Sequence, residues 1–149
     1  ALSPFHAIHA CVEMGASITM AIGASEAGIY PAVACIGDST FTHSGMTGLL
    51  DAVNNNNNIV VMILDNSTTG MTGGQKSSAE GRLESICKGL GVDPDHVRVI
   101  KPLPNQHETN VQVIKEELAY NGVSVIIPRR ECIQTLSRKM RAKKAAENK

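Results

Sequence analysis

The sequence predicts an α/β fold in which a parallel β-sheet is covered by helices on both faces. Short, continuously apolar runs alternate along the chain with longer segments whose apolar residues recur at helical spacing. The runs lack the strict in–out alternation of a half-exposed strand, and this is typical of parallel strands buried on both sides. With 149 residues, the chain has room for one domain with one sizeable core.

The strands are predicted from their apolar residues and from the turn residues that end them. Taken in chain order, the predicted elements are a helix within 11–25, a strand at 32–36, a helix at 45–54, a strand at 59–64, a helix at 83–90, a strand at 97–100, a helix at 108–120, a strand at 124–127 and a helix from 131 onward. The first strand ends at Gly37, the second at Asp65 and the last at Pro128. Cys35 lies inside an apolar run and is therefore predicted to be buried.

The helices are predicted from spacing and from their ends. Residues 11–25 combine apolar and small side chains, which predicts a tightly packed helix after a loop. Val111, Ile114 and Leu118 share one face of the helix at 108–120. The five asparagines at 54–58 separate a helix from a strand, and we interpret them as a turn, because Asn in the left-handed conformation ends helices well.

Composition argues against several classes of protein. Net charge is zero, yet residues 129–149 hold eight of the 14 basic and two of the 14 acidic residues, which leaves residues 1–128 at −6. This basic stretch has no aromatic residues and no recognition motif, so a nucleic-acid partner is disfavoured against a solvated helix end or an acidic partner. No two of the four cysteines form a CxxC pair, which argues against a zinc or iron–sulfur site within this segment.

We expect a cytoplasmic protein that is part of a longer polypeptide. No apolar stretch reaches the ~20 residues that span a bilayer, and nothing suggests secretion or a membrane partner. The chain begins at Ala1 without an initiator Met, and its first residues run straight into an apolar segment. We expect one ligand-binding domain over residues 1–136 and a basic tail over 137–149.

Two polar loops follow two of the predicted strands. The first contains Gly37, Asp38 and Ser39, and the second begins with Asp65 and Asn66, 25 residues further along the chain. Ligands bind outside the carboxyl ends of parallel strands, so adjacent strands would bring Asp38 and Asn66 to the same edge. Carboxylate and amide oxygens suit Mg²⁺, and small residues with helix N-terminal amides suit a phosphate. Taken alone, the first loop could equally be a turn with a capping Asp or Ser.

The two loops together resemble the motif of thiamine-diphosphate enzymes, which is GDG, then about 25 to 30 residues, then NN. The loop from Thr68 to Gln75 ends in TGGQ, which resembles the 2-oxoacid:ferredoxin oxidoreductases. Residues 14–18 and 65–75 look most like the indolepyruvate branch of that family. The resemblance covers roughly residues 11–130. It implies the thiamine-diphosphate-binding fold, a three-layer parallel sheet with helices on both faces.

The resemblance also implies roles for individual residues. Asp38 and Asn66 would bind Mg²⁺ through their side chains, and Thr68 through its backbone carbonyl. Gly37, Ser39 and Thr40 would cradle the diphosphate of the cofactor. The loop formed by Met14, Gly15, Ala16 and Ser17 would lie against its pyrimidine ring. The substrate side would be lined by Met71, Thr72, Gly73, Gly74 and Gln75.

Three residues depart from the family pattern. Ser39 replaces the usual second Gly, which demands an ordinary backbone conformation there. Asp65 replaces the first Asn and is not expected to be a ligand. Met71 stands where pyruvate-specific relatives carry Asn, which fits a bulky aryl substrate. The run at 54–58 is not the terminal NN, because only 14 residues separate it from Ser39 and because it precedes its strand.

The resemblance implies oxidative decarboxylation of an aryl 2-oxoacid such as indolepyruvate to its acyl-CoA, with reduction of ferredoxin. No catalytic side chain is expected in this segment, since the cofactor performs the chemistry and its activating Glu belongs to a separate pyrimidine-binding domain. Iron–sulfur clusters, the coenzyme A site and other subunits would also lie elsewhere. Two alternatives share the loops: a non-oxidative thiamine-dependent decarboxylase or synthase, and a non-catalytic module that binds another phosphate ligand.

Overall fold

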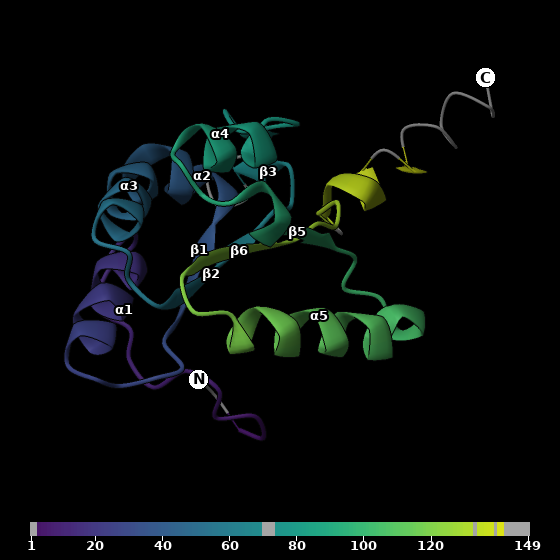
Figure 1. The fold of residues 1–149 in the computed structure, drawn as a ribbon. Helices are drawn as coiled ribbons and strands as arrows, with labels where there is room; N and C mark the ends of the chain where they lie inside the picture. Colours follow the sequence, from purple (N-terminus) through teal and green to yellow (C-terminus); the bar gives the residue numbers. More distant parts are fainter. Residues whose placement is uncertain (1–2, 70–73, 133, 139, 142–149) are drawn as a thin grey trace.

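A computed structural model describes residues 3–69, 74–132, 134–138 and 140–141 of the chain. Its main sheet has four strands, β1 (Val33–Gly37), β2 (Ile59–Leu64), β5 (Val97–Ile100) and β6 (Val123–Pro128). They lie in the order β1-β2-β6-β5, and every pair is parallel. The short strands β3 (Thr68–Thr69) and β4 (Gln75–Lys76) pair antiparallel in a separate ribbon, apart from the four strands of the main sheet, which Figure 1 labels.

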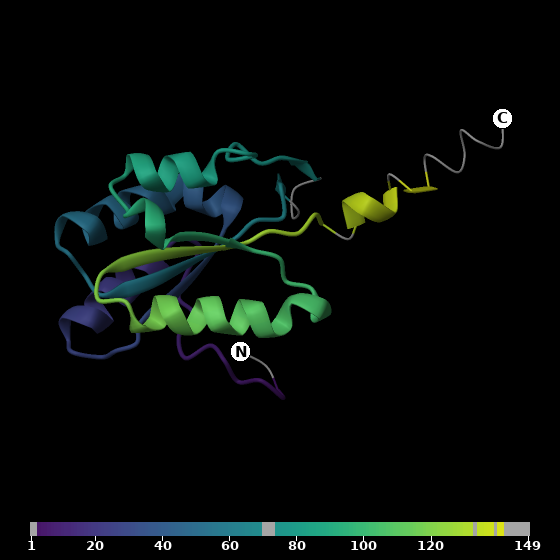
Figure 2. The same cartoon turned by 45° about the vertical axis from the view of Figure 1, so that its right-hand side comes forward.

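Helices cover both faces of the sheet, as predicted. The helices are α1 (Ser17–Glu26), α2 (Asp38–Thr40), α3 (Met46–Asn54), α4 (Leu83–Gly89) and α5 (His107–Ala119), with 3-10 turns at Pro94–His96 and Pro104–Gln106. The larger apolar cluster joins α1, α3 and α4 to one face of β1, β2 and β6. The smaller cluster joins α5 to Val60, Ile100 and Ile126 on the other face. Figure 2 shows the green α5 across the sheet from the teal helices.

The strand positions follow the predictions within one residue at each end. The asparagine run is a turn, as predicted: α3 ends at Asn54, and Asn56 has the positive φ of 51° that a left-handed helix terminator adopts. A helical segment also covers 134–138. No helix among the described residues is long and apolar enough to cross a membrane.

Two predictions for the first half of the chain were wrong. Residues 11–25 were expected to form a tightly packed helix with Val12 among its apolar residues, but the first helix begins at Ser17, and Val12 lies before it and is exposed. Cys35 is exposed instead of buried. β1 is an edge strand, and its side chains alternate: Ala34 and Ile36 join the larger core, whereas Val33 and Cys35 face away from it. An apolar run alone cannot reveal that α5 packs over other strands and leaves this face of β1 open.

Candidate functional site

The carboxyl ends of β1 and β2 lie side by side. Gly37 is the register partner of Leu64, so the next residues along each strand, Asp38 and Asp65, leave the sheet at neighbouring positions. Adjacent strands are about 4.8 Å apart. The predicted convergence of the two polar loops is therefore confirmed. A hydrogen bond from Thr69 Oγ1 to Ser39 Oγ (3.3 Å) joins the loops directly.

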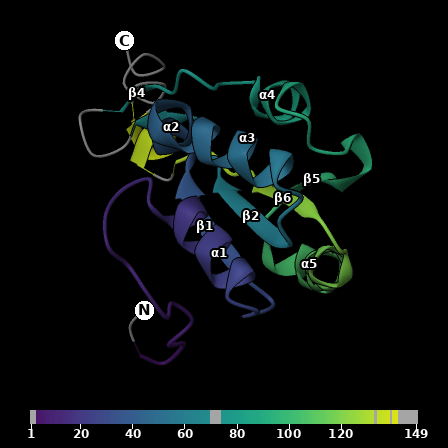
Figure 3. The same cartoon turned by 60° about the vertical axis from the view of Figure 1, so that its left-hand side comes forward.

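A helical run begins immediately at Asp38, earlier than the sequence indicated. α2, a π-helical turn at Phe41–Gly45 and α3 follow one another without a break (Figure 3). The sequence predicted a loop as far as residue 45, because Ser, Thr, His and Gly give no helical periodicity. Packing imposes the helix: Phe41 is fully buried, and a Cβ on Gly45 would lie 2.8 Å from Ile36 and 2.9 Å from Phe41.

The early helix start brings backbone amides to the strand end. Gly37 precedes the first helical residue and provides no side-chain cap. The first amides of a helix have no partner within it, and they favour an anion there. Ser39 lies within this helix, so its backbone has the ordinary conformation expected of a residue that is not Gly. Single π-helical turns inside α-helices frequently mark functional sites.

Asp38 is a buried carboxylate with one unsatisfied oxygen. Its side chain is 3% exposed, and Oδ1 accepts a hydrogen bond from the Ser39 amide (2.8 Å). Oδ2 is buried and has no hydrogen-bond partner among the described residues. Burial raises the pKa of Asp38 and the charge of Asp65 adds to that shift, whereas the Ser39 amide, the nearby Ser77 hydroxyl and the Ser67 amide oppose it. A buried anionic oxygen without a partner is costly, unless a cation or donor from outside the chain meets it.

Asn66 lies at the first turn of the second loop. Its Oδ1 accepts hydrogen bonds from the Thr68 amide (2.9 Å) and hydroxyl (3.2 Å), which fixes the orientation of the side-chain amide. Ser67 between them has a positive φ of 59°, which tightens the turn. Thr68 is buried and begins β3. The two strand ends thus carry a carboxylate and an amide oxygen, the kinds of hard ligand that suit Mg²⁺, and Asn66 Oδ1 is engaged by Thr68 in this structure.

The glycines of the site differ in what they require. A Cβ on Gly37 would meet no atom of the described residues within 4 Å, and its φ of −76° is one that any residue adopts. Packing among those residues therefore gives no reason for glycine there. Gly15 is different, because its φ is +98° and a Cβ would lie 2.2 Å from Ser44 Oγ. The loop before α1 consequently packs against the helical run that starts at Asp38.

The remaining predicted residues are only partly described. Met14 is 76% exposed, and Ala16 and Ser17 are partly buried at the start of α1. Ser17 Oγ is buried without a partner in the described part of the chain. Gln75 begins β4 and Gly74 precedes it; a Cβ on Gly74 would lie 3.7 Å from Arg138 Nη1 and 3.9 Å from Thr135 Oγ1 of the segment 134–138. Met71, Thr72 and Gly73 lie outside the described residues.

Arg129 is a residue near the site that the sequence interpretation missed. It follows β6, and its Nε lies 2.5 Å from Asp65 Oδ2. Its Nη1 and Nη2 donate to the two carboxylate oxygens of Glu84 at 2.9 and 2.8 Å. The hydrogen bonds to Glu84 raise the pKa of Arg129, and the same bonds lower the pKa of Glu84. The only sequence signal was an Asp at the end of one strand and an Arg at the end of another.

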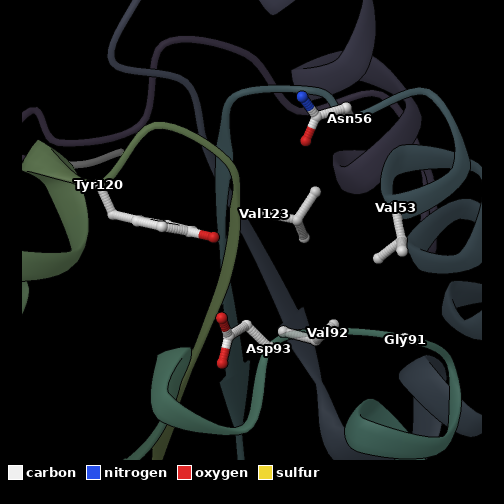
Figure 4. A pocket seen from close by; sticks show the side chains of 7 residues that line it. All are labelled: Val53, Asn56, Gly91, Val92, Asp93, Tyr120 and Val123. Atoms are coloured by element: carbon white, nitrogen blue, oxygen red, sulfur yellow. The ribbon is translucent and has the colours of Figure 1, made fainter.

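A pocket lies at the other end of the strands, opposite the two polar loops. Its lining residues are Val53, Asn56, Gly91, Val92, Asp93, Tyr120 and Val123. Asn56 precedes β2 and Val123 begins β6, so the pocket is at the amino ends of the strands (Figure 4). In Figure 4 the Tyr120 ring and the Asp93 carboxylate face this space. The chemistry predicted from the sequence lies at the carboxyl ends, away from this pocket.

Known proteins resemble this chain at the level of one domain. The family model described as the thiamine pyrophosphate enzyme, C-terminal TPP binding domain, matches residues 2–127. The indolepyruvate oxidoreductase subunit IorA of Archaeoglobus fulgidus is 36% identical over 149 residues, which cover 93% of this chain and 23% of that protein. The subunit of the same name from Methanothermobacter thermautotrophicus is 34% identical over 141 residues, covering 87% and 22%. The chain thus spans less than a quarter of these relatives.

The fold is also found in solved structures. The thiamine diphosphate-dependent 4-hydroxybenzoylformate decarboxylase of Rhodococcus jostii RHA1 superposes with a TM-score of 0.57 at 23% identity, over 79% of this chain and 23% of that one. This likeness shows the fold alone. The resemblance inferred from the two loops is confirmed by the family model and by the named relatives. The chain therefore belongs to the family of C-terminal thiamine-pyrophosphate-binding domains of thiamine pyrophosphate enzymes.

Proposed function

We propose that this domain supplies the diphosphate and Mg²⁺ site of a thiamine-diphosphate-dependent enzyme that oxidatively decarboxylates an aryl 2-oxoacid, such as indolepyruvate, to its acyl-CoA while reducing ferredoxin. One observation carries the site: Asp38 Oδ2 is buried, with no hydrogen-bond partner in the described part of the chain, at the strand end beside the loop of Asn66. The oxidative reaction is supported by the TGGQ sequence at 72–75 and by the relatives named indolepyruvate oxidoreductase subunits.

In this proposal the chain binds and orients the cofactor. Asp38 and Asn66 hold Mg²⁺ through side-chain oxygens, and Thr68 holds it through its carbonyl. Gly37 leaves room for the diphosphate, which the first amides of the helical run and the side chains of Ser39 and Thr40 contact. When bound, thiamine diphosphate supplies the nucleophilic carbon and accepts the electrons released on decarboxylation.

Other parts of the chain shape the surroundings of the cofactor. The Met14–Ser17 loop, anchored at Gly15 against Ser44, lies against the pyrimidine ring. Residues 71–75 line the substrate side. We expect the activating Glu, the iron–sulfur clusters and the coenzyme A site on other domains or subunits in the cytoplasm. The domain over 1–136 is consequently inactive alone.

The whole enzyme tests the reaction. Coenzyme-A-dependent reduction of ferredoxin by an aryl 2-oxoacid is expected, and release of the aldehyde without ferredoxin reduction would instead indicate a non-oxidative enzyme. Calorimetry separates the binding question: thiamine diphosphate with Mg²⁺ is expected to bind, whereas ATP and NAD are not. Tighter binding of ATP or NAD would favour a module for another phosphate ligand.

The substrate class has its own test. Met71→Asn introduces the polar residue of pyruvate-specific relatives, so it should shift kcat/KM from aryl toward small 2-oxoacids. Ferredoxin reduction with indolepyruvate and with pyruvate measures the ratio in the complete enzyme. An unaltered ratio would remove Met71 from the substrate pocket.

A further inference from the structure

Arg129 is fixed between three elements beside the proposed metal site. Its guanidinium contacts Asp65 after β2 and Glu84 in α4, and its backbone amide donates to the Ile100 carbonyl at the end of β5 (2.8 Å). The bidentate geometry toward Glu84 leaves Nε for Asp65. The side chain is 35% exposed, whereas the Asp65 carboxylate that it meets is 3% exposed. Arg129 is therefore the counter-charge of a buried carboxylate.

Asp65 in turn shapes the loop that carries Asn66. While Oδ2 meets Arg129, Oδ1 accepts hydrogen bonds from the amide (3.0 Å) and hydroxyl (3.4 Å) of Ser67. These bonds support the positive φ of Ser67. In the same turn, Asn66 Oδ1 accepts a hydrogen bond from the Thr68 amide. A continuous set of contacts thus runs from α4 through Arg129 and Asp65 to the second half of the site.

The arrangement also controls which carboxylate can reach a cation. Asp38 and Asp65 leave adjacent strands at neighbouring positions, and both are buried. Without a counter-charge, Asp65 would be a second carboxylate available at the same edge. Mg²⁺ keeps a small octahedral shell with one or two carboxylates, whereas Ca²⁺ accepts six to eight oxygens in flexible geometry. An additional free carboxylate would therefore favour Ca²⁺.

We infer that Arg129 is a positioning residue of the metal site, which holds Asp65 out of the coordination sphere, fixes the Asn66 turn and so preserves selectivity for Mg²⁺. This inference rests on the proposed Mg²⁺ site at Asp38 and Asn66. Asp65 stands where the family motif has a neutral Asn, which needs no counter-charge. The Asp–Arg pair is thus a coupled feature of this chain, and Asp65→Asn should make Arg129 dispensable.

The test uses the complete enzyme with saturating thiamine diphosphate. Apparent Kd values for Mg²⁺ and Ca²⁺ are measured for the wild type, Arg129→Met, Asp65→Asn and the double variant. Arg130→Met is the matched control, since it removes the same charge one residue away, and its exposed side chain lies outside the contacts described. Coupling between contacting charged residues spans roughly 2-fold to 150-fold in an equilibrium constant.

Arg129→Met should weaken Mg²⁺ binding about tenfold and shift the Mg²⁺/Ca²⁺ preference toward Ca²⁺ at least fivefold, within that coupling range. The double variant should return both values to within about threefold of Asp65→Asn, and Arg130→Met should match the wild type. Equal weakening of both metals by Arg129→Met, or a double variant no better than the single one, would overturn the inference.

Two further measurements keep the test decisive. If Arg129→Met does not fold, Glu84→Gln loosens the guanidinium but leaves Asp65 paired, and a smaller shift toward Ca²⁺ is required; no shift counts against the inference. If Asp38→Asn binds the cofactor as the wild type does, the proposed metal site itself fails. If Asp38 is essential but the Arg129 variants keep wild-type selectivity, only the role of Arg129 fails.

Discussion

Two buried carboxylates at different ends of the molecule have opposite surroundings. Glu117 in α5 is 1% exposed, and both of its oxygens have partners: His96 Nδ1 at 2.8 Å and Arg98 Nη1 at 3.1 Å. Asp38 is almost as buried, yet its Oδ2 has no partner among the described residues. Burial without pairing costs free energy that a purely structural residue would not retain. The contrast fits a structural role for Glu117 and supports the proposal that Asp38 binds a ligand.

Asp38→Asn is the variant with the largest expected effect, and it tests this contrast directly. In the complete enzyme it should lower Mg²⁺-dependent affinity for thiamine diphosphate by about 100-fold or more, because the diphosphate charge loses its bridging cation. The melting temperature without cofactor should stay equal or rise, since a buried unpaired charge is removed. Calorimetry and thermal unfolding measure the two effects. Unchanged affinity, or a large drop in stability, would make Asp38 a structural residue like Glu117.

The pH dependence of stability and of cofactor binding also tests the contrast between Asp38 and Glu117. Burial raises the pKa of Asp38 above its ordinary value of 3.8, so the fold disfavours the ionised carboxylate as long as no cation is bound. Its contribution to stability is present at low pH and is lost as the pH rises through the raised pKa. A cation needs the ionised form, so affinity for Mg²⁺ and cofactor should fall about tenfold per pH unit below that pKa. Glu117→Gln should leave this profile unchanged.

Glu117→Gln should affect stability instead of binding. It leaves Arg98 and His96 facing a neutral amide, and we expect a loss of about 1–3 kcal/mol in the free energy of unfolding, less than for a fully buried pair because both partners are partly exposed. Glu116→Gln is the matched control. Glu116 is half-exposed and lies 3.5 Å from Arg98, so its loss should stay within about 0.5 kcal/mol. Denaturant titration measures both, and equal losses would show that the burial of Glu117 is unimportant.

The smallest expected effects are those of two glycine substitutions, which should differ in whether they change stability or cofactor binding. Gly37→Ala places a Cβ in open space, so stability should change by less than about 0.5 kcal/mol while cofactor affinity falls severalfold. Gly15→Ala forces a positive φ and a clash with Ser44, and we expect it to cost about 1–3 kcal/mol. Thermal unfolding together with cofactor titration distinguishes the two. Loss of stability in Gly37→Ala would mean that packing, and not a ligand, requires glycine there.

The sequence predicted the strands and the meeting of the two loops for a simple reason. Parallel strands buried on both faces are continuous apolar runs, and their carboxyl ends necessarily share an edge if the strands are neighbours. The helix start at Asp38 was not predictable from periodicity, because the packing of Phe41 and Gly45 imposes it. The exposure of Cys35 depends on β1 being an edge strand, which is a property of topology.

The ion pairs were the least predictable feature. Arg129 and Asp65 are 64 positions apart, and Arg130 is an equally basic neighbour in sequence. Only the parallel bridge between Asp65 and Arg129 decides which arginine meets the carboxylate. The unsatisfied oxygen of Asp38 could not be predicted from the sequence either, since it depends on which donors surround the folded side chain.

The most direct test of the central claim is the position of the cation. Crystals of the complete enzyme with thiamine diphosphate and Mn²⁺ in place of Mg²⁺ would reveal the metal by its anomalous scattering. We predict a peak about 2.0–2.3 Å from an Asp38 carboxylate oxygen and from Asn66 Oδ1, with Asp65 still paired to Arg129. A peak coordinated by Asp65, or one remote from Asp38, would contradict the account.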